Sequence, residues 1–183
     1  MKSRVVMLAA VVLALGAITT ACTPTRTTKS AGEQVDDSTV TAKVKTELAR
    51  DSATSATRID VETFRGDVQL NGFVPSAEMK AEATRVARSV SGVKKVSNNL
   101  RVGGTDRSAG EVVDDTVITA KVKTALATDK TVAAHDVNVE TREGVVQLAG
   151  FVDSSAQKAQ ASEVARRIAG VKQVDNQLEV KTR

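Results

Sequence analysis

Apolar residues recur along the chain at two spacings, and the first is the spacing of a helix. They fall at every fourth position in two stretches, which comprise Val40, Val44 and Leu48 and, later, Ile118, Val122 and Leu126. Such a stripe is typical of an amphipathic helix with one buried face. Asp37 and Ser38 precede the first stripe, and both residue types favour helix caps, so we expect that helix to begin at about Thr39.

The second spacing is an alternation of apolar and polar residues, which is typical of half-buried strands. It covers residues 58–63 and 68–74, and it recurs at the corresponding positions in the second half of the chain. Gly66 lies between the two stretches and Gly144 takes the same place later on, where each favours a turn. Two short strands joined this closely are expected to form an antiparallel hairpin.

A second helix and a third strand are expected after each hairpin. Pro75 with Ser76 opens the first of these helices, and Gly92 ends it as a C-cap. The helix is long enough for a crossover, so the second and third strands should run parallel. The third strand should direct one set of apolar residues inward, namely Val96, Leu100 and Val102.

The same unit occurs twice in the chain. Residues 35–102 align without a gap with residues 113–180 at an offset of 78, and about half of the positions are identical. A fixed offset over this length indicates two copies of one structural unit. Each copy is predicted to be an α+β unit in the order helix, strand, strand, helix, strand. Its two helices should lie on one face of a three-stranded mixed sheet.

Two short segments separate the predicted units from the rest of the chain. Residues 103–112 contain GGTDRSAG and predict a flexible linker, and residues 22–34 are rich in Thr and Ser and predict an extended tether. A domain of ~60 residues buries only about 60% of the surface of its unfolded chain and is marginally stable alone. We therefore expect the two copies to contact each other.

The first residues have the features of an export signal. Lys2 and Arg4 precede an apolar run from Val5 to Ile18, and small residues follow the run. The run is shorter than the ~20 residues that cross a bilayer as a helix. Residues 1–21 are therefore predicted to be a signal peptide.

Cys22 is the only cysteine, so it cannot form a disulfide within the chain. A free thiol or an intermolecular disulfide is one interpretation. A metal-binding or catalytic thiol is another, although only Thr, Pro, Arg and Lys follow at short range. The segment that ends at Cys22 also resembles the lipobox of bacterial lipoproteins, which implies acyl chains on Cys22. Thr23 then implies the outer membrane, facing the periplasm, whereas Thr19-x-Ala21 resembles an ordinary signal-peptidase site and would leave a soluble periplasmic protein.

The composition argues against nucleic-acid binding and against catalysis. Without Lys2 and Arg4 the formal net charge falls from +4 to +2, and the chain has three Phe but no Trp or Tyr. The only histidine, His135, falls in a loop, and no His–Cys–acid cluster provides a metal site. We therefore expect no enzyme activity, no metal and no other cofactor.

Three kinds of residue that occur in both copies are given structural roles. The paired acids at 36–37 and 114–115 are expected to cap helix N-termini. Asn98 and its equivalent should anchor the last strand through hydrogen bonds. Gly72 and its equivalent interrupt a strand, which we interpret as close helix–strand packing, with close approach of a ligand as the alternative.

The sheet face opposite the helices is predicted to be polar, because Gln69, Asn71 and Arg101 project from it. Phe73 and Phe151 break this pattern at equivalent positions. Either each phenylalanine packs at the sheet edge or under the other unit, or each anchors an external partner or lipid.

Two motifs recur at the same distance in both copies and carry a resemblance. They are GDVQLNGFV with GVKKVSNNLRV in the first copy and GVVQLAGFV with GVKQVDNQLEV in the second. On these motifs the chain resembles the BON-domain family. With a lipobox, the resemblance implies a non-enzymatic outer-membrane lipoprotein that binds anionic phospholipid and supports envelope integrity. Without one, it implies a periplasmic chaperone or interaction module for outer-membrane proteins under osmotic stress.

The resemblance implies phospholipid contact around the first helix of the second copy. That region has three lysines but also Asp115 and Asp129; the lysines are Lys121, Lys123 and Lys130. A denser basic cluster lies in the first copy and comprises Arg85, Arg88, Lys94 and Lys95. The first copy carries a net charge of +2 and the second −2, so the first copy is the alternative site of membrane contact.

Overall fold

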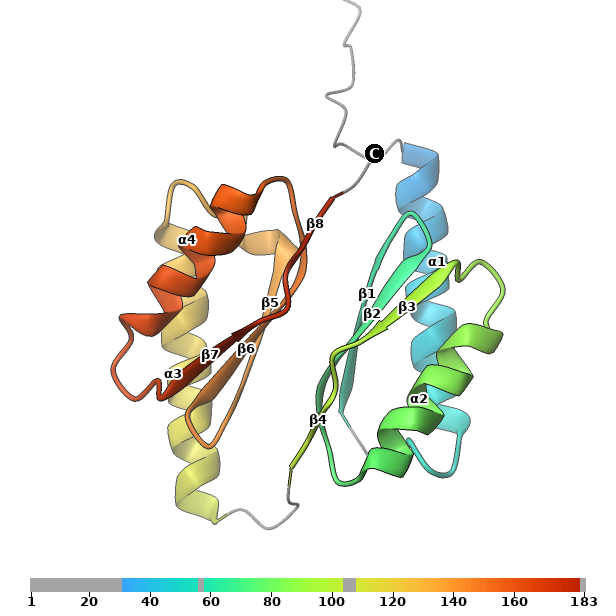
Figure 1. Cartoon of the computed structure of the whole chain (residues 1–183), viewed down its shortest axis with the longest axis horizontal. Coiled ribbons are helices and arrows are strands. Elements are labelled where there is room, and N and C mark those ends of the chain that lie inside the picture. Colours follow the sequence, from blue (N-terminus) through green and yellow to red (C-terminus); the bar gives the residue numbers. More distant parts are fainter. Residues whose placement is uncertain (1–30, 56–57, 104–107, 182–183) are drawn as a thin grey trace, which may run out of the picture.

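The computed structural model describes residues 31–55, 58–103 and 108–181. The predicted signal peptide, Cys22 and most of the predicted tether lie outside these residues. Within the described part of the chain, no helix combines the length and the apolar character needed to cross a membrane. The helices and strands form two similar units, and each unit has two helices on one face of its sheet (Figure 1).

The first unit confirms the predicted hairpin and crossover. Strands β1 and β2 pair antiparallel, and β3 and β4 both pair parallel with β2, so β2 is the central strand of a mixed sheet. The elements are α1 (Ala31–Arg50), β1 (Ile59–Phe64), β2 (Asp67–Val74), α2 (Ala77–Ser89), β3 (Lys95–Asn98) and β4 (Arg101–Val102).

The second unit repeats this topology, with β6 as the central strand. A short 3-10 helix, η1, is added before its first strand. The elements are α3 (Ala109–Thr128), η1 (Ala134–Asp136), β5 (Val137–Arg142), β6 (Val145–Val152), α4 (Ser155–Arg166), β7 (Gln173–Asn176) and β8 (Glu179–Val180).

Each unit has its own hydrophobic core between its helices and its sheet. The predicted helix stripes are buried there, with Val44 and Val122 fully inaccessible to solvent. The central strands contribute Leu70 and Leu148, which are also fully buried. The four-residue spacing in the sequence therefore identified the core-facing sides of α1 and α3.

Both long helices begin earlier than predicted. Helix α1 begins at Ala31, inside the predicted tether, and α3 begins at Ala109, inside the predicted linker. Ser108 caps α3: its Oγ accepts a hydrogen bond from Glu111 N at 3.2 Å, and the Glu111 carboxylate accepts one from Ser108 N at 2.8 Å. The prediction that the paired acids cap these helices was therefore wrong.

Asp37 and Asp115 instead lie within the helices and hold the hairpin turns. The Asp37 carboxylate accepts hydrogen bonds from the N–H groups of Arg65 at 2.8 Å and Gly66 at 2.9 Å. Asp115 makes the same pair of contacts, at the same distances, with the turn of the second unit. Both side chains are buried, at 5% and 4% exposure, and a buried carboxylate is stable only when such donors satisfy it. Each acid therefore fixes its hairpin to its first helix.

The predicted last strand is divided into two short strands by a break after Asn98. The Asn98 side chain donates to Lys80 O and to Thr84 Oγ1, both at 2.6 Å, and accepts from Leu100 N at 3.0 Å. The second unit repeats these contacts, which confirms the anchoring role. Val102 is 54% exposed, so its predicted inward position was wrong, because it ends the two-residue strand β4 where the chain leaves the unit.

Candidate functional site

The sheet face opposite the helices is turned toward the other unit in both halves of the molecule (Figure 1). The two helical layers lie on the outside and the two sheets lie between them. Gln69 and Gln147, at the centre of this arrangement, are 0% and 1% exposed. The expected contact between the copies is therefore confirmed, and the polar sheet face is an internal interface.

Each of these glutamines contacts a glycine in the other unit. Gln147 Oε1 accepts a hydrogen bond from Gly72 N at 2.8 Å, and Gln69 Oε1 accepts one from Gly150 N at 2.9 Å. Gln147 Nε2 donates to Asn99 O at 2.8 Å, and Gln69 Nε2 has the equivalent but longer contact. The buried amides are thereby satisfied by backbone groups across the interface.

Close helix–strand packing, the interpretation given to Gly72 and Gly150, was wrong, because none of the atoms nearest to either Cβ position belongs to an α-helix. Their φ values are +117° and +122°, a region that residues with a Cβ rarely adopt. A Cβ at Gly150 would lie 2.1 Å from the Asp136 carbonyl oxygen. A Cβ at Gly72 would lie 2.9 Å from the Arg58 carbonyl oxygen of the same unit and 2.9 Å from Glu140 Oε2 of the other unit. The groups that lie closest to both glycines belong to the chain itself: a backbone carbonyl of the same unit in each case, and the Glu140 carboxylate across the interface at Gly72.

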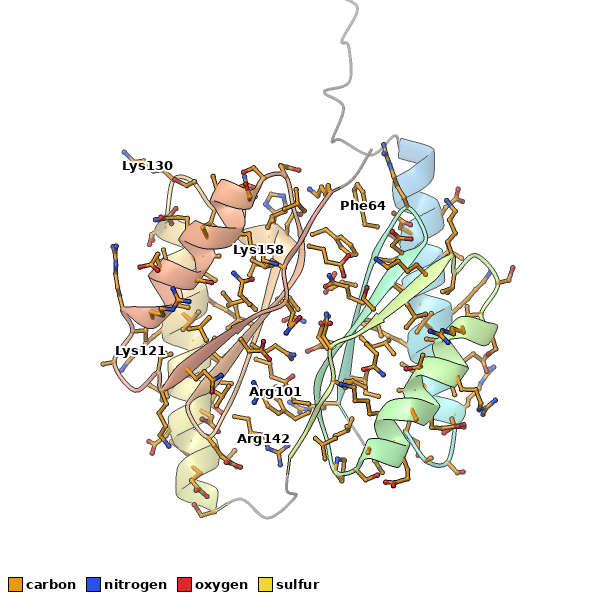
Figure 2. All side chains as sticks on the ribbon, in the orientation of Figure 1. Phe64, Arg101, Lys121, Lys130, Arg142 and Lys158 are labelled. Atoms are coloured by element: carbon orange, nitrogen blue, oxygen red, sulfur yellow. The ribbon has the colours of Figure 1, made fainter. Side chains whose placement is uncertain are left out.

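Phe73 and Phe151 both contact the opposite unit. Phe151 is 8% exposed and stacks on Phe64, with 5.5 Å between ring centroids. Arg142 takes the place of Phe64 in the second repeat, and its guanidinium carbon lies 5.5 Å from the centroid of Phe73. Figure 2 shows Phe64 and Arg142 between the two units, toward opposite ends of the interface. The partner that the structure provides for each phenylalanine is the other unit of the same chain.

Charged side chains at this interface are complementary. Arg101 Nη1 lies 3.0 Å from Asp175 Oδ2, and Lys95 Nζ lies 3.9 Å from Glu179 Oε2. In both pairs the base belongs to the first unit and the acid to the second. The opposite net charges of the two copies are therefore explained in part by contact between the copies.

The basic residues predicted as a cluster in the first unit lie in different environments. Lys95 is paired across the interface, whereas Arg85 is paired with Glu82 on the same helix. The hydrogen bond from Arg85 lowers the pKa of Glu82. Arg88 and Lys94 are exposed. The fold thus leaves only part of this cluster available to a membrane surface.

The three candidate lysines of the second unit also separate. Lys121 lies on the solvent side of α3, Lys123 lines a groove between the units, and Lys130 follows the end of the helix (Figure 2). Asp115 is buried under the hairpin turn, and it lines the same surface cavity as Lys121, together with Asp114 and Glu143. Asp129 is bonded to Gln160, and this hydrogen bond lowers the pKa of Asp129.

Exposed valines on α3 were missed by the sequence reasoning. Val112, Val113 and Val117 are 44%, 61% and 44% exposed. Val113, Val117 and Lys121 are spaced four residues apart, so they share one face of the helix. The signal was present in the sequence as a second apolar stripe beside the core stripe. The result is a surface on which apolar side chains adjoin a cation.

The described residues offer no sign of metal or histidine chemistry. His135 has a side chain that is 83% exposed, with Nε2 3.3 Å from Asp136 Oδ1. No group of three or more His, Cys, Asp or Glu side chains suited to a metal ion occurs in the part of the chain that the structure describes.

Comparison with known protein families matches the BON domain at residues 36–104 and again at residues 114–182. The chain belongs to the BON domain family. This confirms the resemblance drawn from the glycine-containing motifs, and the α+β fold of two tandem BON units agrees with it.

Two curated relatives are named as an osmotically inducible protein and as an outer membrane lipoprotein. Osmotically-inducible protein Y of Escherichia coli strain K12 is 42% identical over 153 residues, which cover 82% of this chain and 75% of that protein. The outer membrane lipoprotein DolP of Haemophilus influenzae is 36% identical over 147 residues, or 80% of this chain and 75% of DolP.

Among solved structures, the chain is similar to the C-terminal domain of CdsD, a structural protein of the type III secretion system of Chlamydia trachomatis. The match has 14% identity and a TM-score of 0.34, and it covers 78% of this chain and 96% of the other. At this score the similarity carries no functional argument.

Proposed function

We propose that this protein is tethered to the outer membrane by acyl chains on Cys22, faces the periplasm, and contacts anionic phospholipid through α3. The main support is the face that joins exposed Val113 and Val117 to Lys121. The relative DolP is named an outer membrane lipoprotein, which agrees with a location at the outer membrane. Contact of this kind is how the protein would support envelope integrity.

The energetics of this contact are those of a weak surface interaction. Full burial of a valine side chain contributes about 1.5–3 kcal/mol, and these valines are already partly buried against the helix. A lysine near an anionic surface adds about 1 kcal/mol. A tether raises the effective concentration of α3 at the bilayer, so contacts of this size suffice.

The anchor supplies the remaining affinity. Each buried methylene of an acyl chain contributes ~0.8 kcal/mol, so several chains on one cysteine hold a protein almost permanently. Eight residues, 23–30, lie between Cys22 and the start of α1 at Ala31, so the two ends are at most ~30 Å apart. The two units therefore remain near the lipid surface.

Vesicle flotation tests the lipid contact. The mature chain with Cys22→Ser should float with vesicles that contain phosphatidylglycerol or cardiolipin, and added salt should weaken the binding. Val117→Asp should weaken it about tenfold, because the new carboxylate opposes both burial and the anionic surface. Thr39→Asp is the matched control, since Thr39 is the exposed equivalent of Val117 in α1. Equal flotation of both variants, or none by the parent, would refute the contact.

The anchor is tested separately through Cys22. Native protein should have an intact mass that includes acyl chains, and Cys22→Ala should move the protein from the membrane to the soluble periplasmic fraction. A mass that corresponds to an unmodified Cys22 thiol would refute the lipid anchor. It would not affect the result of the vesicle flotation experiment.

A further inference from the structure

A groove of about 1010 Å³ lies between the two units, and Val112 lines it whereas Val113 and Val117 do not. One wall is formed by α3 and the other by the end of α1. The lining residues on these helices are Val112, Thr116, Thr119, Ala120 and Lys123 from α3 and Lys45, Leu48 and Ala49 from α1. Four consecutive residues of β5, Asn138–Thr141, also line the groove, and the first unit adds Thr54, Ser55 and the residues at the start of β1, Arg58, Ile59 and Asp60.

The groove runs along the open edge of β5. Successive side chains of a strand point to opposite faces, so a cavity lined by four in a row lies beside the strand and not above one face. Strand β5 pairs with β6 on one side, and the described residues supply no strand on the other side. The backbone of β5 therefore borders the groove, in addition to the side chains that line it.

The register shows which backbone groups face the groove. The β5–β6 hairpin closes with a two-residue turn at Glu143 and Gly144, with φ values of +54° and +78°. In such a hairpin the flanking residues, Arg142 and Val145, form a hydrogen-bonded pair. Every second residue pair along the two strands is then also hydrogen-bonded. The alternate residues Val139 and Thr141 therefore direct their N–H and C=O groups toward the open side.

We propose that the groove binds an extended polypeptide segment, which pairs with β5 as an additional strand. An extended backbone is the partner that can satisfy donors and acceptors repeated at strand spacing. From Val112 to Lys123 the α3 wall is ~17 Å long, which matches about five extended residues. This site goes beyond lipid contact and requires neither Cys22 nor the valines Val113 and Val117.

The walls specify the chemistry of the segment. Leu48, Ala49 and Ala120 provide apolar surface. The exposed charged side chains of the lining are all cations, Lys45, Arg58 and Lys123, whereas the acids Asp60 and Glu140 are half-buried. Asp115 is among the lining residues, but its carboxylate is bound to the hairpin turn. The bound segment should therefore alternate apolar and polar residues and carry acidic residues at its ends.

NMR with a defined peptide tests the pairing. The probe is acetyl-Asp-Thr-Val-Thr-Val-Thr-Asp-amide, added to the full mature chain with Cys22→Ser. Binding should shift the amide signals of Val139 and Thr141 and slow their hydrogen exchange. The equivalent amides of Val61 and Thr63 in β1 lie outside the groove and should not change. Shifts confined to other surfaces, or no binding at millimolar peptide, would overturn the proposal.

Two matched sets of controls separate strand pairing from general adhesion. Two further probes carry N-methyl groups at alternate residues, one at the odd-numbered and the other at the even-numbered positions. The probe whose methyl groups block the N–H groups that face β5 should lose affinity at least tenfold, and the other should retain it. Ala120→Arg should fill the groove and weaken binding at least tenfold, whereas Ala42→Arg, at the equivalent position of α1 outside the groove, should not. Equal binding to both variants, or to both methylated probes, would reject the site. Val117→Asp, which should weaken vesicle flotation, should bind the probe as tightly as the parent, because Val117 does not line the groove. This proposal and the lipid contact therefore fail independently.

Discussion

Gln147 Oε1 lies 2.8 Å from the backbone nitrogen of Gly72 and accepts its hydrogen bond across the interface between the units. Gln69 and Gly150 form the equivalent contact at 2.9 Å. Two polar sheet faces thereby become one buried interface whose donors and acceptors are matched. The two BON units consequently form one structure, and the surfaces left for lipid or protein are the helices and the groove.

Replacement of Gln147 by leucine should destabilise the protein. Gly72 N–H and Asn99 C=O would remain buried without their partner, which costs about 1–3 kcal/mol for each unsatisfied group. Urea unfolding should show a lower midpoint for Gln147→Leu. The exposed Gln173→Leu serves as the control and should leave the midpoint unchanged. Identical midpoints for the two variants would contradict the bridging role.

The two interface glycines should differ in their tolerance of alanine. A Cβ at Gly150 would meet a backbone carbonyl at 2.1 Å, whereas the nearest atoms at Gly72 are 2.9 Å away. Both variants also carry strain of roughly 1–3 kcal/mol from a positive φ. Thermal unfolding should therefore rank Gly150→Ala well below Gly72→Ala in stability. If Gly72→Ala were the less stable variant, the close contact with the carbonyl oxygen would not be what excludes a side chain at Gly150.

Charge reversal should test the pairing of Arg101 with Asp175. Asp175→Arg places two cations together and should cost about 1 kcal/mol, since the pair is only partly exposed. Adding Arg101→Asp should recover most of that loss. A double-mutant cycle by chemical unfolding measures the coupling, and simple additivity of the two changes would show that the contact contributes nothing.

Lys181 should give the protein a distinct stability profile at alkaline pH. Burial lowers the pKa of Lys181, but hydrogen bonds to Asp136 and Asp153 raise it by more, so the pKa lies above its ordinary value. A raised pKa stabilises the fold fully below the unfolded value of about 10.4, and this stabilisation is lost as pH rises through the folded pKa. The stability difference between the parent and Lys181→Gln should be constant from neutral pH to about 10 and shrink above it. If the stability difference between the parent and Lys181→Gln instead grew as the pH rose above about 10, the pKa of Lys181 would not be raised in the folded protein.

Local patterns predicted the fold because each unit builds its core from regular spacing. The stripe of Val40, Val44 and Leu48 and the alternation around Gly66 specify a helix and a hairpin without knowledge of distant residues. The 78-residue repeat then required the second unit to have the same topology. These features depend on neighbours within a few residues.

Features that depend on distant partners were misjudged or missed. Asp37 occupies a position suited to a helix cap, and only the fold reveals that its carboxylate meets the turn 28 residues later. Gln69 has the polarity of a solvent-facing residue, yet it is buried against the other unit. Hydropathy cannot distinguish a polar face in water from one whose hydrogen bonds are matched by a second polar face.

Candidate membrane residues were chosen by charge, and charge proved an incomplete guide. Lys95 is engaged by Glu179 and Lys123 lines the groove, whereas Lys121 remains on an exposed face. The apolar half of that face, Val113 and Val117, follows from the same four-residue spacing that identified the core. A search for a second stripe on each helix would have found it.

The contact between α3 and anionic lipid is tested most directly by NMR of the mature Cys22→Ser chain with phosphatidylglycerol nanodiscs that carry a spin label in the headgroup region. Signals of Val113, Val117 and Lys121 should broaden most, while the equivalent helix face of α1 should retain its intensity. Broadening centred on Arg88 and Lys94 in the first unit, or none at all, would contradict the proposed function.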